Sequence, residues 1–128
     1  MKTQYTIGLA MLTGIGVGAV AVQGLHAQAK PPVYYIAQND VTDADAYVKE
    51  FASKVPATVK AHGGRFLVRG GKVTALDGEA PKARVVVQVY ESMKQLKGWL
   101  SSPEYQALRK IGTKYATFHT FAVEGVSE

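Results

Sequence analysis

The side chains best suited to chemistry in this sequence are one histidine and two arginines in predicted strands. His119 is a candidate general base or ligand contact, because the histidine side chain as a type exchanges protons near neutral pH. Arg65 and Arg69 stand two apart, a spacing that places both guanidinium groups on one face of a strand. Two such groups can bind a carboxylate or an enolate through paired hydrogen bonds. Gly70 and Gly71 come next and would let a ligand approach the backbone closely.

Each of these residues also has a purely structural interpretation. A strand histidine can simply bond to a neighbour at a sheet edge, and surface arginines usually pair with carboxylates. The carboxylates available for such pairs are Asp40, Glu91 and Glu124. Tyr34 and Tyr35 point to opposite faces of one strand, so one of them faces away from the helices and its hydroxyl can line a cavity. Periodicity sets this alternation without naming the face that lines the cavity.

Several kinds of site are excluded or disfavoured by composition. The sequence has no cysteine, which excludes disulfides, thiolate nucleophiles and cysteine metal sites. Its histidines, His26, His62 and His119, lack the spacing of a metal-binding motif, and there is no Gly-x-Ser-x-Gly nucleophile elbow. The net charge is +5, but basic residues are interspersed with acidic ones and form no stripe. We therefore expect no metal, no cofactor and no nucleic-acid partner.

The candidate residues must be positioned by a short series of strands and helices. Residues 33–39 are β-branched and aromatic, as in a strand, and an amphipathic helix then runs from residue 44 to Gly63, kinked near Val55 by Pro56. Residues 65–69 alternate as a strand, with a short extension at 73–76 before a turn at Asp77 and Gly78. A buried strand over 84–90, helices beginning at Ser92 and Pro103, and a last strand over 117–124 complete the chain.

The order of these elements predicts the fold class. A β-α-β-β-α-β order with right-handed crossovers gives a ferredoxin-like α+β sandwich, whose antiparallel sheet carries both helices on one face. The other face of the sheet is too apolar to remain in water, and such faces usually mark association sites. Two sheets facing each other would cover it, so we expect a homodimer that forms an α/β barrel.

The first 29 residues differ from the rest of the chain. Lys2 supplies one positive charge, residues 6–22 contain no charged side chain, and Ala27 and Ala29 form an A-x-A site. This layout predicts a signal peptide cleaved after Ala29, a single domain over residues 30–128, and a periplasmic or secreted protein with no stable membrane span after cleavage. The alternative is an uncleaved N-terminal membrane anchor, because the apolar run is close to spanning length.

Three stretches and the chain ending resemble one known family. The stretches are residues 40–43 (Asp-Val-Thr-Asp), 63–71 (Gly-Gly-Arg-Phe-Leu-Val-Arg-Gly-Gly) and 101–106 (Ser-Ser-Pro-Glu-Tyr-Gln), and the ending is Val-Glu-Gly at 123–125. They resemble the family called domain of unknown function 1330. The resemblance implies the dimeric α/β-barrel superfamily, which includes small monooxygenases, isomerases and proteins with no known activity. Members usually carry a Glu-Phe pair at the end of the third strand, whereas this chain has Gln88, which cannot act as an acid or base.

These observations favour one function and leave a second open. The first is a protein that binds a small, possibly anionic molecule in a cavity inside each half of the dimer, or a cofactor-independent enzyme acting on a carbonyl or enol compound. In that hypothesis Arg69, helped by Arg65, holds the anion, His119 moves a proton, and Tyr34 or Tyr35 completes the polar set. The second is a non-catalytic envelope protein that acts through dimerisation or contact with another chain.

Overall fold

A long first strand lies at the centre of the sheet. β1 (Val33–Val41) alternates buried and half-buried side chains along most of its length, as expected where one face is covered by helices and the other is open. The computed structural model describes residues 30–127, so the predicted signal peptide and its cleavage site lie outside the described residues. No helix among residues 30–127 is both long and apolar enough to cross a membrane.

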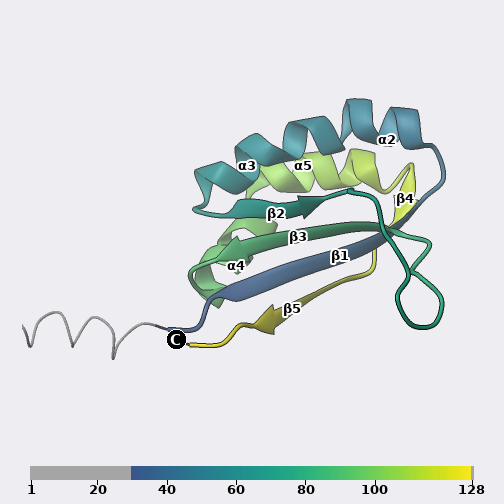
Figure 1. Ribbon diagram of the computed structural model, residues 1–128. Coiled ribbons are helices and arrows are strands. Elements are labelled where there is room, and N and C mark those ends of the chain that lie inside the picture. The colour runs from purple at the N-terminus through teal and green to yellow at the C-terminus, as the bar shows by residue number, and fades with distance from the viewer. Residues whose placement is uncertain (1–29, 128) are drawn as a thin grey trace, which may run out of the picture. The chain divides into compact units, whose positions relative to one another are not determined.

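Four further strands pair with β1 or with its neighbour. They are β2 (Arg65–Arg69), β3 (Arg84–Tyr90), β4 (Ala116–Thr117) and β5 (Thr120–Glu124). The sheet order is β2-β3-β1, with β4 and β5 both paired to the far side of β1, and all pairs are antiparallel (Figure 1). This is the ferredoxin-like order, so the predicted fold class is confirmed. Within one chain the sheet is open, with β2 at one edge and β5 at the other.

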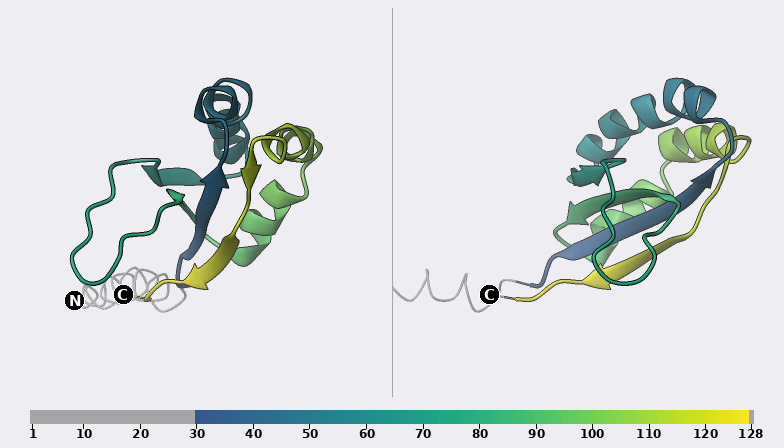
Figure 2. Two further views of the ribbon diagram at one scale, coloured as in Figure 1. Left: turned by 90° about the vertical axis from the view of Figure 1, so that its right-hand side faces the viewer. Right: turned by 45° about the vertical axis from the view of Figure 1, so that its right-hand side comes forward.

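The helices cover one face of this sheet and leave the other uncovered (Figure 2). They are α2 (Ala44–Glu50), the 3-10 turn η1 (Ala52–Lys54), α3 (Val55–Ala61), α4 (Met93–Leu100) and α5 (Pro103–Gly112). The first predicted helix is therefore broken rather than kinked. Pro56 sits in the first turn of α3, where the missing N–H costs no hydrogen bond, and the chain tightens into η1 just before it.

One expectation about β2 is wrong. Arg65 lies opposite Val89 and Arg69 lies opposite Val86, with a register shift between Phe66 and Val68. The bulge at this point adds one residue to β2, and an extra residue reverses the side-chain alternation beyond it. Arg69 therefore lies on the helix-covered face and Arg65 on the open face, although simple two-residue periodicity places them together.

The connection between β2 and β3 also differs from expectation. Residues 73–76 form no strand, and residues 70–83 make one long loop, which projects from the sheet on the side away from the helices (Figures 1 and 2). The predicted turn at Gly78 is present, with a φ of 70° that favours glycine. Leu76 near the tip of this loop is 88% exposed.

Candidate functional site: a cavity between sheet and helices

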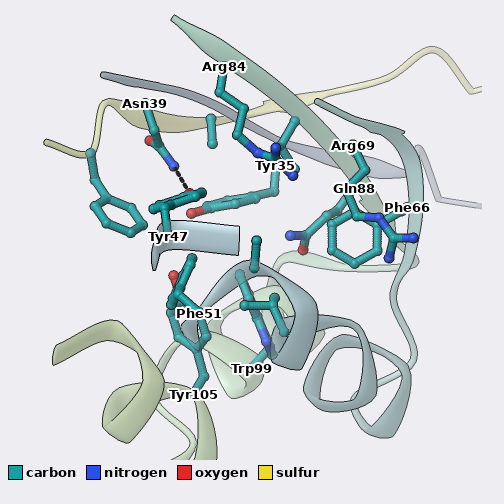
Figure 3. Close-up of a pocket in the computed structure, with 15 residues that line it drawn as sticks. Tyr35, Asn39, Tyr47, Phe51, Phe66, Arg69, Arg84, Gln88, Trp99 and Tyr105 are labelled. Carbon is teal, nitrogen blue, oxygen red and sulfur yellow. Dashed lines mark hydrogen bonds between the residues drawn. The ribbon is translucent and has the colours of Figure 1, made fainter. Parts of the chain in front are cut away.

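A cavity lies inside the fold, between the helix-covered face of the sheet and the helices (Figure 3). Aromatic rings supply much of its wall, including those of Tyr35, Tyr47, Phe51, Phe66 and Trp99. Its free volume is about 30 Å³, enough for about one or two water molecules. The polar lining comes from Asn39, Gln88, Arg69 and Arg84 together with tyrosine hydroxyls.

A larger cleft lies next to this inner cavity. Its volume is about 310 Å³, and its walls are Val48, Ala52, Ser53, Pro56, Arg69 and Arg84. Ligand sites commonly begin at roughly 300 Å³, so the cleft is large enough for a small molecule. Arg69, Arg84 and Ala52 line both spaces, so the cleft and the cavity adjoin at these residues.

The two arginines at this junction lack acidic partners. Among the described residues the only ion pair joins His119 to Asp40. The guanidinium carbon of Arg69 instead lies 5.0 Å from the centre of the Phe66 ring, and that of Arg84 lies 5.6 Å from the centre of the Tyr47 ring. The Nε atom of Arg84 is buried without a hydrogen-bond partner. Two positive charges thus face the cleft with no anion to balance them.

Gly70 makes room for one of these guanidinium groups. Its φ is 70°, and a Cβ at this position would come within 2.5 Å of Nη1 of Arg84. The positive φ favours glycine here, and any larger residue would also make the Arg84 guanidinium move. From the sequence, Gly70 and Gly71 were expected to let a ligand approach the backbone. In the structure the group nearest to Gly70 is instead the guanidinium of Arg84.

Two buried amides connect the cavity to the strands behind it. Nδ2 of Asn39 donates to the Tyr47 hydroxyl over 3.1 Å, and Oδ1 of Asn39 accepts from the backbone N–H of His119 over 3.2 Å. The Tyr90 hydroxyl donates to Oε1 of Gln88 over 2.7 Å. Asn39 and Gln88 are each only 2% exposed, so these bonds satisfy groups that would otherwise be costly to bury.

The tyrosines of the cavity remain protonated near neutral pH. Burial raises the pKa of Tyr35, although a hydrogen bond from Tyr105 and the charge of Arg109 oppose it. Burial likewise raises the pKa of Tyr47, against the hydrogen bond from Asn39 and the charge of Arg84. Burial raises the pKa of Tyr105 as well. Neither a carboxylate nor a histidine is among the cavity-lining residues. The site can therefore bind and polarise a ligand, but its lining contains no base that titrates near neutrality.

The structure brings together two of the five residues singled out in the sequence. Arg69 lines both spaces and Tyr35 lines the inner cavity. Arg65 and Tyr34 lie on the open face of the sheet, with Tyr34 opposite Val89 of β3. His119 lies between β4 and β5 and outside the cavity lining; its side chain is 59% exposed, with Nε2 3.2 Å from Oδ2 of Asp40. It contributes to the site through its backbone N–H.

Five polar residues that line the inner cavity are absent from the sequence-based set: Asn39, Tyr47, Arg84, Gln88 and Tyr105. One signal for Asn39 was present in the sequence, since it follows Tyr35 at even spacing and so shares its face of β1. A polar residue in phase with a buried strand face indicates a buried polar site. Arg84 gave no such signal, because an arginine at a strand end usually faces solvent. Within the described residues, no three histidine, aspartate or glutamate side chains form a group able to hold a metal ion.

The fold and the cavity together define a ferredoxin-like α+β protein with a helix-covered, arginine-lined cavity. The chain belongs to the family called domain of unknown function 1330, whose model matches residues 32–126. No curated protein sequence matches the chain significantly.

Solved structures with the same fold include proteins of different descriptions. A protein of unknown function from Rhodopseudomonas palustris is 13% identical, with a TM-score of 0.60, covering 84% of this chain and 93% of its own. SnoaB, a cofactor-independent oxygenase from Streptomyces nogalater, is 11% identical (TM-score 0.53; 77% and 96% covered). A putative antibiotic biosynthesis monooxygenase from Caulobacter crescentus CB15 is 20% identical (TM-score 0.56; 81% and 98% covered). At these identities the likeness establishes a shared fold.

Proposed function

We propose that this protein binds a small planar anion at the junction of the cleft and the inner cavity, and that it acts as a cofactor-independent enzyme on a carbonyl or enol compound. The observation that carries the proposal is the pair of guanidinium groups of Arg69 and Arg84, which have no acidic partner and line both spaces. Charge-assisted, forked hydrogen bonds from arginine suit a carboxylate or an enolate. The aromatic walls supply flat apolar surfaces for the body of such a ligand.

The descriptions of two structural neighbours support the enzymatic half of this proposal. One is described as a cofactor-independent oxygenase and another as a putative monooxygenase. The cavity here lies on the helix-covered face, so a ligand would sit within one subunit and not between the two sheets of a dimer. The proposed site therefore includes Arg84 and leaves out His119. Arg69 still holds the anion in this proposal, and Tyr35 still contributes a polar group.

Substitution of Arg69 tests the proposal directly. Trp99 is the only tryptophan in the sequence and lines the inner cavity, so its fluorescence reports on ligands bound there. With 4-nitrobenzoate as the probe, Arg69→Ala is expected to raise the Kd by about tenfold or more, since a hydrogen bond to a charged group contributes about 1.5–3 kcal/mol. Arg65→Ala is the matched control: it is the same change on the same strand but on the open face, and it should leave the Kd within about twofold. Unchanged binding in Arg69→Ala, or equal effects in the two variants, would contradict the proposed site.

We also propose that the open face of the sheet pairs with a second copy of the chain. Most side chains on this face are apolar, and Gln38 and Arg65 lie among them; the apolar ones are Tyr34, Ile36, Val68, Val85, Val87, Val89, Phe121 and Val123. Phe121 and Val123 are 51% and 46% exposed, which is high for side chains gathered on one apolar surface. A twofold pairing would cover the open face of each copy with that of the other. The loop of residues 70–83 projects on the same side, where its exposed Leu76 would contact the second copy. A role exercised through this dimer alone, without a ligand, is the competing hypothesis, and unchanged probe binding in Arg69→Ala would favour it.

Export of the chain is a further part of the proposal. It is supported by the basic start, the uncharged middle and the A-x-A site of residues 1–29. The measurement is the intact mass of the protein recovered from the periplasm or the medium of the expressing cell. A mass beginning at Lys30 is expected, and a mass retaining residues 1–29 in the membrane fraction would favour the anchor instead.

A further inference from the structure

The side-chain amide of Asn39 is held in one orientation by a backbone donor. Its Oδ1 accepts from the backbone N–H of His119, and a backbone N–H can only donate. Nδ2 must therefore be the atom that faces Tyr47, and it too can only donate. The Tyr47 hydroxyl oxygen is thus the acceptor, and its own proton has to go elsewhere. Among residues 30–127 no acceptor bonds to that proton, although Tyr47 is only 2% exposed.

The amide of Gln88 and the two arginines also present hydrogen-bond donors to the cavity. Oε1 of Gln88 accepts from Tyr90, which leaves the amide N–H groups of Gln88 for the cavity, and its nitrogen points into that space in Figure 3. Arg69 and Arg84 can only donate. Tyr47, Gln88, Arg69 and Arg84, from α2, β3 and β2, therefore each present at least one hydrogen-bond donor to a ligand, and the hydroxyl oxygens of Tyr35, Tyr47 and Tyr105 can also accept.

We propose that this positively charged, donor-rich lining selects the deprotonated form of a weakly acidic phenol or enol and so lowers the pKa of the bound ligand. The inference rests on the proposed function and narrows the ligand from anions in general to the oxyanion of a weak acid. An oxyanion accepts hydrogen bonds from Tyr47 and Gln88 while the arginines balance its charge. A neutral phenol or enol could donate its O–H to a tyrosine hydroxyl, but its oxygen is a weaker acceptor than an oxyanion and leaves the two guanidinium charges unbalanced.

The proton released on binding goes to solvent. The O–H bond of the ligand breaks, its electron pair stays on the ligand oxygen, and water or buffer takes the proton. The charged and titratable groups that face the ligand are Tyr35 on β1, Tyr47 on α2, Arg69 on β2, Arg84 on β3, and Tyr105 with the nearby Arg109 on α5. Burial raises the pKa of Tyr35, Tyr47 and Tyr105, so these tyrosines stay protonated between about pH 5 and 8, and no histidine or carboxylate lines the cavity. The ionisation of the ligand itself therefore dominates in that range.

The test uses the full chain and 4-nitrophenol, a phenol that ionises near neutrality and whose phenolate absorbs visible light. The phenolate fraction is measured against pH with and without excess protein. Binding is expected to lower the apparent pKa of the probe by about one unit or more, which corresponds to about tenfold tighter binding of the phenolate than of the phenol. A bound probe whose pKa is unchanged or raised would overturn the inference.

Two variants and one control locate the effect. Tyr47→Phe keeps the ring but removes one donor, and it should reduce the preference for phenolate by about tenfold. Gln88→Glu replaces amide donors with a carboxyl group and should remove the shift. Tyr34→Phe makes the tyrosine change on the open face and should leave the shift intact. Circular dichroism and Trp99 emission establish that each variant is folded, and a full shift retained in both Tyr47→Phe and Gln88→Glu contradicts the inference.

A second probe separates failure of this inference from failure of the proposed function. 4-Nitrobenzoate is already ionised near neutral pH, so its binding depends on the arginines alone. If 4-nitrobenzoate binds and its binding depends on Arg69, while the pKa of bound 4-nitrophenol is unchanged, only the inference about phenolate selection fails. If neither probe binds, both proposals fail together.

Discussion

Replacing Trp99 with alanine is expected to lower the free energy of unfolding by about 3–5 kcal/mol and the melting temperature by more than about 10 °C. Trp99 is 1% exposed and forms the centre of an aromatic cluster. Its ring lies 5.2 Å from that of Tyr35, 6.0 Å from that of Tyr90 and 4.1 Å from that of Tyr105, measured between centroids. Truncation leaves a hole in this cluster, and the strands on one side cannot collapse to fill it.

The measurement is thermal and urea unfolding followed by circular dichroism at one protein concentration, because an oligomer's melting temperature depends on concentration. Nε1 of Trp99 donates to Oγ1 of Thr58 over 2.9 Å, and Thr58→Val removes that acceptor with little change in volume. It should cost about 1 kcal/mol, which separates the hydrogen bond from the packing. Lys94→Ala, at an exposed position of α4 and away from the open face of the sheet, should change nothing measurable. A loss below about 1 kcal/mol in Trp99→Ala would contradict this account of the core.

Replacing Ile36 with aspartate is expected to convert the proposed dimer into monomers at micromolar concentration. Ile36 is at the middle of the open face, between Val87 of β3 and Phe121 of β5. In a monomer the new carboxylate stays hydrated, whereas a twofold interface would bury it twice without partners. A buried, unpaired charge costs several kcal/mol, so the Kd of the dimer should rise by at least about a hundredfold.

Sedimentation or native mass spectrometry would measure the distribution between monomer and dimer. Ala107→Asp places the same charge on the exposed surface of α5 and should leave the dimer intact. Trp99 emission should be alike in both variants, because the core lies on the opposite face of the sheet. A wild-type monomer, or a dimer that tolerates Ile36→Asp, would contradict the proposal that this face is the interface.

Local sequence chemistry predicted the fold closely. The helix boundaries depend on local interactions: Asp43 caps α2, Ser92 and Ser102 cap α4 and α5, and Gly63 has the positive φ of a helix terminus. These signals are local because each depends on hydrogen bonds or steric limits within a few residues. The order of the elements then left the ferredoxin-like arrangement as the simplest topology.

The site was predicted less completely. Arg69 and Tyr35 were identified, but Arg65 was assigned to the same face of β2 as Arg69, because no residue near Leu67 indicates a β-bulge in the sequence. His119 attracted attention by its titratable ring, and the structure uses its backbone N–H to orient Asn39 instead. Arg84 was missed because its role depends on Gly70, a residue distant in sequence whose lack of a Cβ leaves space for the guanidinium.

The sequence by itself determined the order of the main strands and helices, the fold class and the apolar character of both sheet faces, since these follow from periodicity, caps and the order of elements. Only the tertiary structure decided which face encloses the cavity and which polar groups meet there. One inserted residue in β2 places Arg65 and Arg69 on opposite faces of the sheet. A single backbone N–H, that of His119, sets the direction of the Asn39–Tyr47 hydrogen bond. Both depend on strand register, because register determines which residues from distant parts of the chain become neighbours.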